Sequence, residues 1–248
     1  LVGDSYDYPK ITFETNVIGT VNILEAISHC KSVKAGVIIT SDKCYKNIEQ
    51  VWGYKETDKL GGDDPYSASK GCAEFVINSY FKSFFNKDYP VIASTRAGNV
   101  IGGGDWAENR IVPDCFKALY SDKSILIRSP NSTRPWQFVL EPLRGYIMLG
   151  EKLYKGEREF SGSWNFGPSL EKVYTVEDVT KEIIKNWGKG SLVIKKNKNF
   201  HEYGLLQLDC AKAKTYLQWK PLLNFGECIR FTTEWYKYHN KDRDLNKD

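Results

Sequence analysis

The amino-acid sequence predicts an α/β protein built around an open parallel sheet. The segments AGVIIT at residues 35–40 and PVIAST at 90–95 are short, apolar and rich in β-branched residues, which is typical of strands buried on both faces of such a sheet. A segment with helical spacing of its apolar residues lies between them. Strand, helix and strand in this order indicate a right-handed βαβ unit, and therefore a Rossmann-like sheet with helices on its faces.

Residues at the ends of the predicted helices support this order. Pro9 suits the first turn of a helix whose apolar residues recur every three or four positions as far as Ile27. Asp64 can cap, and Pro65 can begin, the helix that joins the two strands, and we expect this helix to end near Asn86.

The spacing of elements changes after residue 104, which predicts a second, smaller α/β domain. The segment Thr-Val-Glu-Asp at 175–178 approximates a capping box and predicts the start of one of its helices. The elements expected beyond residue 104 are helices at 110–120, 141–154, 175–187, 209–217 and 225–238, and strands at 125–128 and 136–139.

The composition excludes several classes of protein. The 248 residues are 41% hydrophobic and 14% aromatic, which is enough to bury a large core and excludes a disordered chain. The 35 basic and 31 acidic residues give a net charge of +4 without a concentrated basic stripe, so we expect no nucleic-acid partner. No run reaches 18 apolar residues, so we expect no membrane partner.

The six cysteines predict a reducing compartment and no metal site. None are spaced as C-x-x-C, and no histidine lies at zinc-finger spacing from them. Several lie within apolar helical patterns, which is typical of small reduced core residues. We therefore predict a cytoplasmic protein without a bound metal.

Tyr66 and Lys70 are the main candidates for catalysis. They lie four residues apart at the start of a predicted helix, so they share one face, and they follow a buried strand and a glycine-rich loop. A phenol has a pKa of about 10, and lowering it by about three units needs roughly 4 kcal/mol. One ammonium about 4 Å away supplies roughly that at an effective dielectric of about 20. Tyr66 can then act as a general base toward an alcohol, and Lys70 can also hold a cofactor hydroxyl.

Ser41, Asp42 and Lys43 form a second cluster at the carboxyl end of the first predicted strand. They offer a hydroxyl, a carboxylate and an ammonium in consecutive positions. The simpler interpretation is a polar loop in which Asp42 pairs with Lys43. Together with Tyr66 and Lys70, however, the cluster would converge on one edge of the sheet, where a carboxyl can serve as a general acid if its surroundings raise its pKa.

Six motifs occur in one order along nearly the whole chain. They are NVIGT at 16–20, TSDKCY at 40–45, YSASK at 66–70, RAGNVIGGGDW at 96–106, RPWQ at 134–137 and LDCAKA at 208–213. Together they resemble the extended short-chain dehydrogenase/reductase family, and within it the sugar-nucleotide 4,6-dehydratases, those acting on CDP-glucose in particular.

The resemblance implies an NAD-dependent dehydration of a nucleotide sugar, CDP-glucose, to CDP-4-keto-6-deoxyglucose. It implies that Tyr66 takes the C4 hydroxyl proton while NAD takes the C4 hydride, that water is lost across C5 and C6, and that the hydride returns to C6. Ser41 matches the hydroxyl that polarises the C4 oxygen, and Asp42 matches the acid for the C6 hydroxyl. Lys43 stands where dTDP-glucose dehydratases have the glutamate that is their C5 base, so it acts either as a neutral base or as a cation that stabilises the enolate.

The resemblance also implies binding residues and an assembly. Thr15, Tyr66 and Lys70 match positions that contact the NAD cofactor. Positions that hold the sugar diphosphate and nucleoside are matched by Asn99, Arg110, Arg134 and Asn165. Members of the family associate through helices of the cofactor domain, so we expect a homo-oligomer.

The glycine loop of this fold is not found in the sequence. No G-x-x-G-x-x-G segment precedes the first predicted strand, and residue 1 is Leu. We therefore expect the chain to lack two to three leading βα units, on the order of 60–100 residues at about 30 per βαβ unit, and to be unstable or inactive alone. Residues 1–108 and 134–167 are then expected to be the remainder of the NAD-binding domain. Residues 109–133 and 168–248 are expected to form the substrate-binding domain.

Two alternatives stay open. One is another nucleotide-sugar enzyme of the same family, a dehydratase for dTDP- or GDP-sugars or a 4-epimerase; the other is a non-catalytic, nucleotide-sensing homologue. Asp42 disfavours a simple epimerase, which needs no acid at C6. Tyr66 and Lys70, both present, disfavour a non-catalytic protein.

Overall fold

A computed structural model of the chain describes residues 2–85, 90–169, 172–195 and 205–245, with side chains as far as residue 239. The chain forms two compact units. Unit 1 contains Leu1–Gly98, Pro142–Gly167 and Gln207–Lys220, and unit 2 contains Asn99–Glu141, Pro168–Leu206 and Pro221–Asp248. Within the described residues, no helix is both long and apolar enough to cross a membrane.

The compact units divide the chain differently from the expected functional domains. Residues 99–108 and 134–141, expected in the cofactor domain, belong to unit 2, and 207–220, expected in the substrate domain, belong to unit 1. The assignment of functions to domains stays a prediction.

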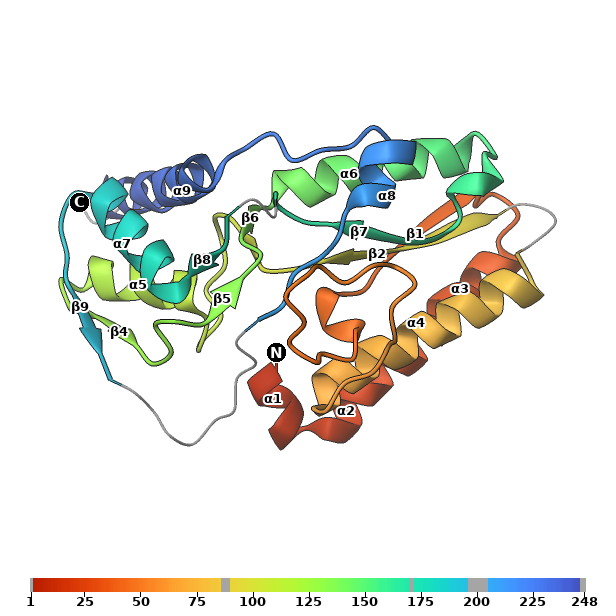
Figure 1. Cartoon of the computed structure of the whole chain (residues 1–248), viewed down its shortest axis with the longest axis horizontal. Helices are drawn as coiled ribbons and strands as arrows, with labels where there is room; N and C mark the ends of the chain where they lie inside the picture. The colour runs from red at the N-terminus through yellow and green to blue at the C-terminus, as the bar shows by residue number, and fades with distance from the viewer. Residues whose placement is uncertain (1, 86–89, 170–171, 196–204, 246–248) are drawn as a thin grey trace. The chain divides into compact units, whose positions relative to one another are not determined.

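Unit 1 is built on a three-stranded parallel sheet in the order β1-β2-β7 (Figure 1). The strands are β1 Ala35–Ile39, β2 Val91–Ala97 and β7 Gly162–Phe166, and both pairings are parallel. The central strand β2 is buried at every residue but its last, as its continuous apolar run predicts. Among the described residues β1 pairs with β2 alone, and it is only half-buried. The predicted α/β, Rossmann-like sheet is thus confirmed.

Helices cover both faces of this sheet (Figure 1). On one side lie α3 Gly19–His29 and α4 Pro65–Ser83, whose apolar residues pack on β2 in a core that includes Leu24, Ile77 and Ile92. On the other side lie α6 Leu140–Tyr154 and α8 Ala211–Tyr216. A short helical turn, Arg158–Phe160, precedes β7.

The first helices depart from the continuous helix predicted from Pro9 to Ile27. The structure has α1 Val2–Asp7 and α2 Pro9–Phe13, then a π-helical turn, Glu14–Ile18, before α3. A π turn inserts one residue into the helical spacing and is frequent at functional sites. Here it carries Thr15, one of the predicted cofactor contacts.

Helix α4 begins as its sequence predicts. The Asp64 carboxylate accepts a hydrogen bond from the Ser67 backbone N–H at 2.9 Å, and Pro65 occupies the first turn. The helix ends at Ser83, and the predicted end near Asn86 lies outside the described residues.

Unit 2 packs three helices around an aromatic core. The helices are α5 Ile111–Tyr120, α7 Val176–Trp187 and α9 Phe225–Leu245. The ring of Phe116 stacks on Tyr236 with centroids 3.9 Å apart, and the capping box at the start of α7 is formed by Thr175 and Asp178 as predicted. The short strands pair as β3 Val100–Ile101 with β6 Gln137–Phe138, β4 Ile125–Ile127 with β9 Leu192–Ile194, and β5 Thr133–Arg134 with β8 Tyr174–Thr175.

The triple glycine 102–104 serves packing in unit 2. A Cβ atom added to Gly103 would lie 2.0 Å from Cδ2 of Trp235 on α9, and one added to Gly102 would lie 2.8 Å from a Val139 methyl group. Gly104 has a φ of +82°, in the left-handed region. Gly102 and Gly103 therefore let the chain pass directly against neighbouring side chains, and Gly104 allows the turn.

Replacing Gly103 with alanine should lower the free energy of unfolding by about 1–3 kcal/mol, because the Trp235 ring would have to move. Chemical denaturation measures this change. The matched control is Gly3→Ala on α1, where an added Cβ meets no atom within 4 Å. Equal stability of the two variants would contradict the packing role of Gly103.

Candidate functional site

Tyr66 and Lys70 lie together at the start of α4. The Lys70 ammonium is 5.8 Å from the centroid of the Tyr66 ring. Burial lowers the pKa of Lys70 from its ordinary value, and the nearby Cys44 and Glu74 side chains oppose this shift. The structure therefore places a partly desolvated cation beside the phenol, as the four-residue spacing predicts.

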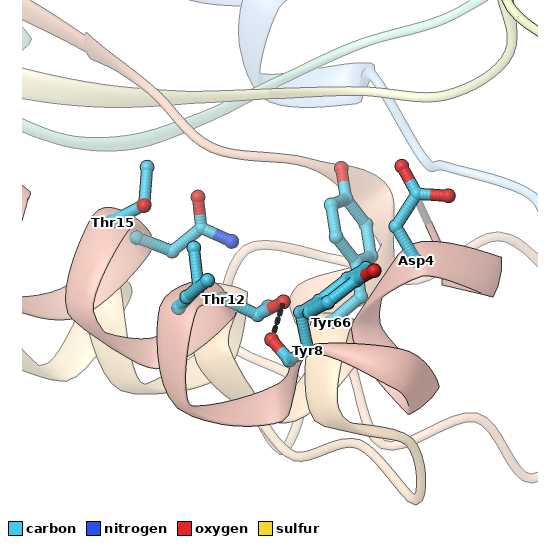
Figure 2. A pocket seen from close by; sticks show the side chains of 7 residues that line it. Asp4, Tyr8, Thr12, Thr15 and Tyr66 are labelled. Carbon is cyan, nitrogen blue, oxygen red and sulfur yellow. Dashed lines mark hydrogen bonds between the residues drawn. The ribbon is translucent and has the colours of Figure 1, made fainter.

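A cavity of about 410 Å³ opens in front of Tyr66 (Figure 2). Helices α1, α2 and α4, the π turn and the residue between α1 and α2 contribute to its wall. The lining residues are Asp4, Tyr8, Ile11, Thr12, Thr15, Asn16 and Tyr66. Thr15 and Tyr66, both predicted to contact the cofactor, thus line the same cavity.

Four polar residues of this cavity were not among the predicted site residues: Asp4, Tyr8, Thr12 and Asn16. Asn16 also fixes the π turn to α4, because its Nδ2 donates to the Ser69 hydroxyl at 2.9 Å. The spacing of Tyr8, Thr12 and Asn16, four residues apart, is the signal that could have found them, since it marks one polar helical face.

Ser41, Asp42 and Lys43 form a tight turn, which we call the 41–43 turn, and Thr40 joins it to the end of β1. The Ser41 hydroxyl donates to Asp42 Oδ1 at 3.0 Å and accepts the Lys43 backbone N–H at 3.3 Å. Asp42 is 3% exposed, whereas Lys43 is half-buried. The 3₁₀ turn Asp42–Cys44 packs against α4, so unit 1 brings the two predicted catalytic clusters to the same region.

Asn165, a predicted substrate-binding residue, is fully buried in β7. Its Oδ1 accepts from the Tyr45 hydroxyl at 2.8 Å, and its Nδ2 donates to the carbonyls of Tyr54 at 2.8 Å and Asp209 at 3.1 Å. In this structure the Asn165 side chain therefore serves internal hydrogen bonds and does not face an open surface.

The other three predicted substrate-binding residues belong to unit 2. Arg110, at the N-terminus of α5, forms an ion pair with Asp105 at 3.0 Å and is 53% exposed. Arg134 lies in β5 and donates to the Thr133 carbonyl at 2.7 Å, and the Asn99 carbonyl accepts from the Gln137 N–H at 3.3 Å. The roles of these residues toward a ligand stay predictions.

Cysteines and metal ligands add no further site in the described part of the chain. All six cysteines are free thiols, four of them buried. Among the described residues, no group of three or more His, Cys, Asp or Glu side chains is arranged to hold a metal ion.

Comparisons with known proteins identify the family of the chain. Residues 1–232 match the family described as GDP-mannose 4,6 dehydratase. A CDP-glucose 4,6-dehydratase of Salmonella typhimurium is 45% identical over 251 residues, covering 99% of this chain and 70% of that protein. A dTDP-glucose 4,6-dehydratase of Escherichia coli is 25% identical, covering 94% and 68%.

Solved structures share the fold. The dTDP-glucose 4,6-dehydratase DesIV from Streptomyces venezuelae superposes with a TM-score of 0.82 at 20% identity, covering 97% of this chain and 71% of that one. A UDP-glucose 4-epimerase from Thermotoga maritima superposes with a TM-score of 0.81 at 20% identity, covering 96% and 74%. The resemblance to sugar-nucleotide dehydratases is thus confirmed, and the chain belongs to the GDP-mannose 4,6 dehydratase family.

Proposed function

We propose that the protein catalyses the NAD-dependent dehydration of CDP-glucose to CDP-4-keto-6-deoxyglucose. The observation that carries this proposal is the placement of Tyr66 and Lys70 on the helix against which the turn containing Asp42 packs. The choice of CDP-glucose is supported by 45% identity, over 99% of the chain, to a CDP-glucose 4,6-dehydratase.

The polar groups that line the cavity in front of Tyr66 suit hydrogen bonding to NAD. Thr15, Asn16 and the Tyr66 phenol offer hydrogen-bonding groups at its wall, and the Lys70 ammonium lies beside the phenol. Thr15, Tyr66 and Lys70 would hold the cofactor there. When bound, NAD supplies a hydride acceptor for C4 and a hydride donor for C6.

The residues of the chain move the protons. Tyr66, as a phenolate stabilised by the Lys70 ammonium, accepts the proton of the sugar C4 hydroxyl. The resulting ketone acidifies the C5 proton, and Asp42 in its protonated form donates to the departing C6 hydroxyl. The Ser41 hydroxyl, which in the structure donates to Asp42 Oδ1 at 3.0 Å, would turn to donate to the C4 oxygen and polarise it.

Lys43 has two possible roles at C5, and Lys43→Arg separates them. Arginine keeps the positive charge but is not deprotonated in proteins. If Lys43 is the C5 base, Lys43→Arg should lower the rate of water loss by about 10²–10⁴-fold, measured by quenched-flow mass spectrometry. A rate within about tenfold of the unaltered protein would instead support electrostatic stabilisation of the enolate.

We also propose that the protein is a cytoplasmic homo-oligomer. The free cysteines, four of them buried, suit a reducing compartment. Ile18, Ile23 and Phe75, on the π turn, α3 and α4, are more than half exposed, and such apolar residues are suited to contact with a second copy.

Incubation with NAD⁺ and single nucleotide sugars tests the proposed function. The protein is given CDP-glucose, dTDP-glucose, UDP-glucose or GDP-mannose, and mass spectrometry detects the loss of one water. We expect loss from CDP-glucose. Loss from another sugar alone would overturn the substrate choice, and epimerisation without water loss would overturn the reaction.

A further inference from the structure

A buried ion pair lies beside the 41–43 turn. Arg96 Nη2 is 2.6 Å from Glu74 Oε2, and each side chain is 2% exposed. The hydroxyls of Ser94 and Ser163 donate to the same carboxylate oxygen at 2.8 and 3.2 Å. Burial alone would raise the pKa of Glu74, but Arg96 and the hydroxyl donors outweigh it and hold this pKa below its ordinary value. The pair is therefore charged and hydrogen-bonded in the interior.

The two ends of the segment 40–45 are hydrogen-bonded to this one ion pair. At the first end, the Thr40 hydroxyl donates to Glu74 Oε1 at 2.5 Å. At the last end, Arg96 Nη1 donates to the Tyr45 hydroxyl at 2.7 Å, and the guanidinium lies 4.8 Å from the centre of the Tyr45 ring. The 41–43 turn is thus held from both sides by Glu74 and Arg96.

The same ion pair belongs to the helix that carries the proposed base. Glu74 lies four residues after Lys70 and eight after Tyr66, so the three side chains follow one face of α4. Arg96 lies on the central strand β2. The pair therefore connects the 41–43 turn, the catalytic helix and the sheet.

We infer that Glu74 and Arg96 are positioning residues that hold the 41–43 turn in register with Tyr66 and Lys70. The inference rests on the proposed function, because it concerns the alignment of the residues that oxidise C4 with those that remove water. Alignment matters because a misplacement of about 1 Å can cost about 10²-fold in rate.

Thr40→Val tests this inference with Ser94→Ala as a matched control. Both variants remove one hydroxyl that donates to the Glu74 carboxylate, but only Thr40 belongs to the segment 40–45. A purely structural ion pair would respond alike to both. Tyr45→Phe is a second variant if Thr40→Val does not fold. It removes the hydrogen bond from Arg96 to the segment, together with the one from Tyr45 to Asn165, and keeps the ring beside the guanidinium.

The first readout is amide hydrogen exchange in the full-length protein without ligands. The amides of Cys44 and Tyr45 donate to the carbonyls of Ser41 and Asp42 and report on the turn. We expect these amides to exchange about tenfold faster in Thr40→Val than in the unaltered protein, because the variant loses one hydrogen bond to a charged group. We expect no comparable change in Ser94→Ala. Equal exchange in the two variants would overturn the inference.

The second readout is the ratio of water loss to C4 oxidation with CDP-glucose and NAD⁺. We expect Thr40→Val to lower this ratio about tenfold or more. Water loss depends on Asp42 and Lys43, which both shift with the turn, whereas C4 oxidation keeps its base, Tyr66, in place on α4 and loses only the contact of Ser41. We expect Ser94→Ala to retain the ratio. An unchanged ratio in Thr40→Val would overturn the inference. If the proposed function is wrong, the unaltered protein will not dehydrate CDP-glucose. The hydrogen-exchange measurement would then still decide whether the ion pair holds the turn.

Discussion

Tyr66→Phe should lower kcat for dehydration by about 10²–10⁴-fold, the usual contribution of a general base. The variant keeps the ring that lines the cavity but removes the group that accepts the C4 proton. The defect should appear before any water is lost, so no reduced cofactor should accumulate in a single turnover. Stopped-flow absorbance of the reduced nicotinamide measures this step.

Tyr80→Phe is the matched control for this experiment. Tyr80 lies on the same helix, and its hydroxyl donates to the Glu25 carboxylate at 2.5 Å. Removing that hydroxyl should leave the oxidation rate within about twofold, because Tyr80 does not line the cavity in front of Tyr66 and keeps its ring in the core. Rapid C4 oxidation by Tyr66→Phe would contradict the role of Tyr66 as the base.

Asp42→Asn should preserve C4 oxidation and lower the rate of water loss by about 10²–10⁴-fold. Asparagine has nearly the shape of aspartate and can still accept the hydrogen bond from Ser41, so the 41–43 turn should keep its geometry. It has no proton to give to the departing C6 hydroxyl. We therefore expect a 4-keto sugar nucleotide that retains its C6 oxygen, which mass spectrometry detects after trapping with borodeuteride.

The outcome for Asp42→Asn also separates the candidate reactions. A 4-epimerase has no step at C6, so its turnover would not depend on an acid there. Full dehydration by Asp42→Asn, in a variant with an unchanged melting temperature, would contradict the assignment of Asp42 as the acid.

Local signals in the sequence predicted the framework of unit 1. The runs at 35–40 and 90–95 became parallel neighbours, and Asp64 caps the helix that Pro65 begins. These elements depend on residues close together in sequence, namely β-branched runs and helix ends. The four-residue spacing of Tyr66 and Lys70 likewise depends only on helix geometry.

What the sequence did not reveal depends on contacts between distant segments. The π turn at Glu14–Ile18 keeps apolar residues at spacings of three and four, so periodicity does not distinguish it from a regular helix. Asn165 is polar and matched a substrate position, but the Tyr45 hydroxyl, 120 residues away, occupies its Oδ1. The pairing of Glu74 with Arg96 also requires the tertiary fold, because charged residues are seldom fully buried.

Transfer of the C4 hydrogen within the sugar is the most direct test of the proposed chemistry. The full-length protein, with NAD⁺, would be given CDP-glucose that carries deuterium at C4, and NMR would locate the label in the product. If C4 is oxidised and the same hydride returns after water loss, the deuterium lies in the C6 methyl group of the 4-keto-6-deoxy product. Deuterium retained at C4, in an epimerised or unchanged sugar, would contradict the dehydratase mechanism at Tyr66 and Asp42.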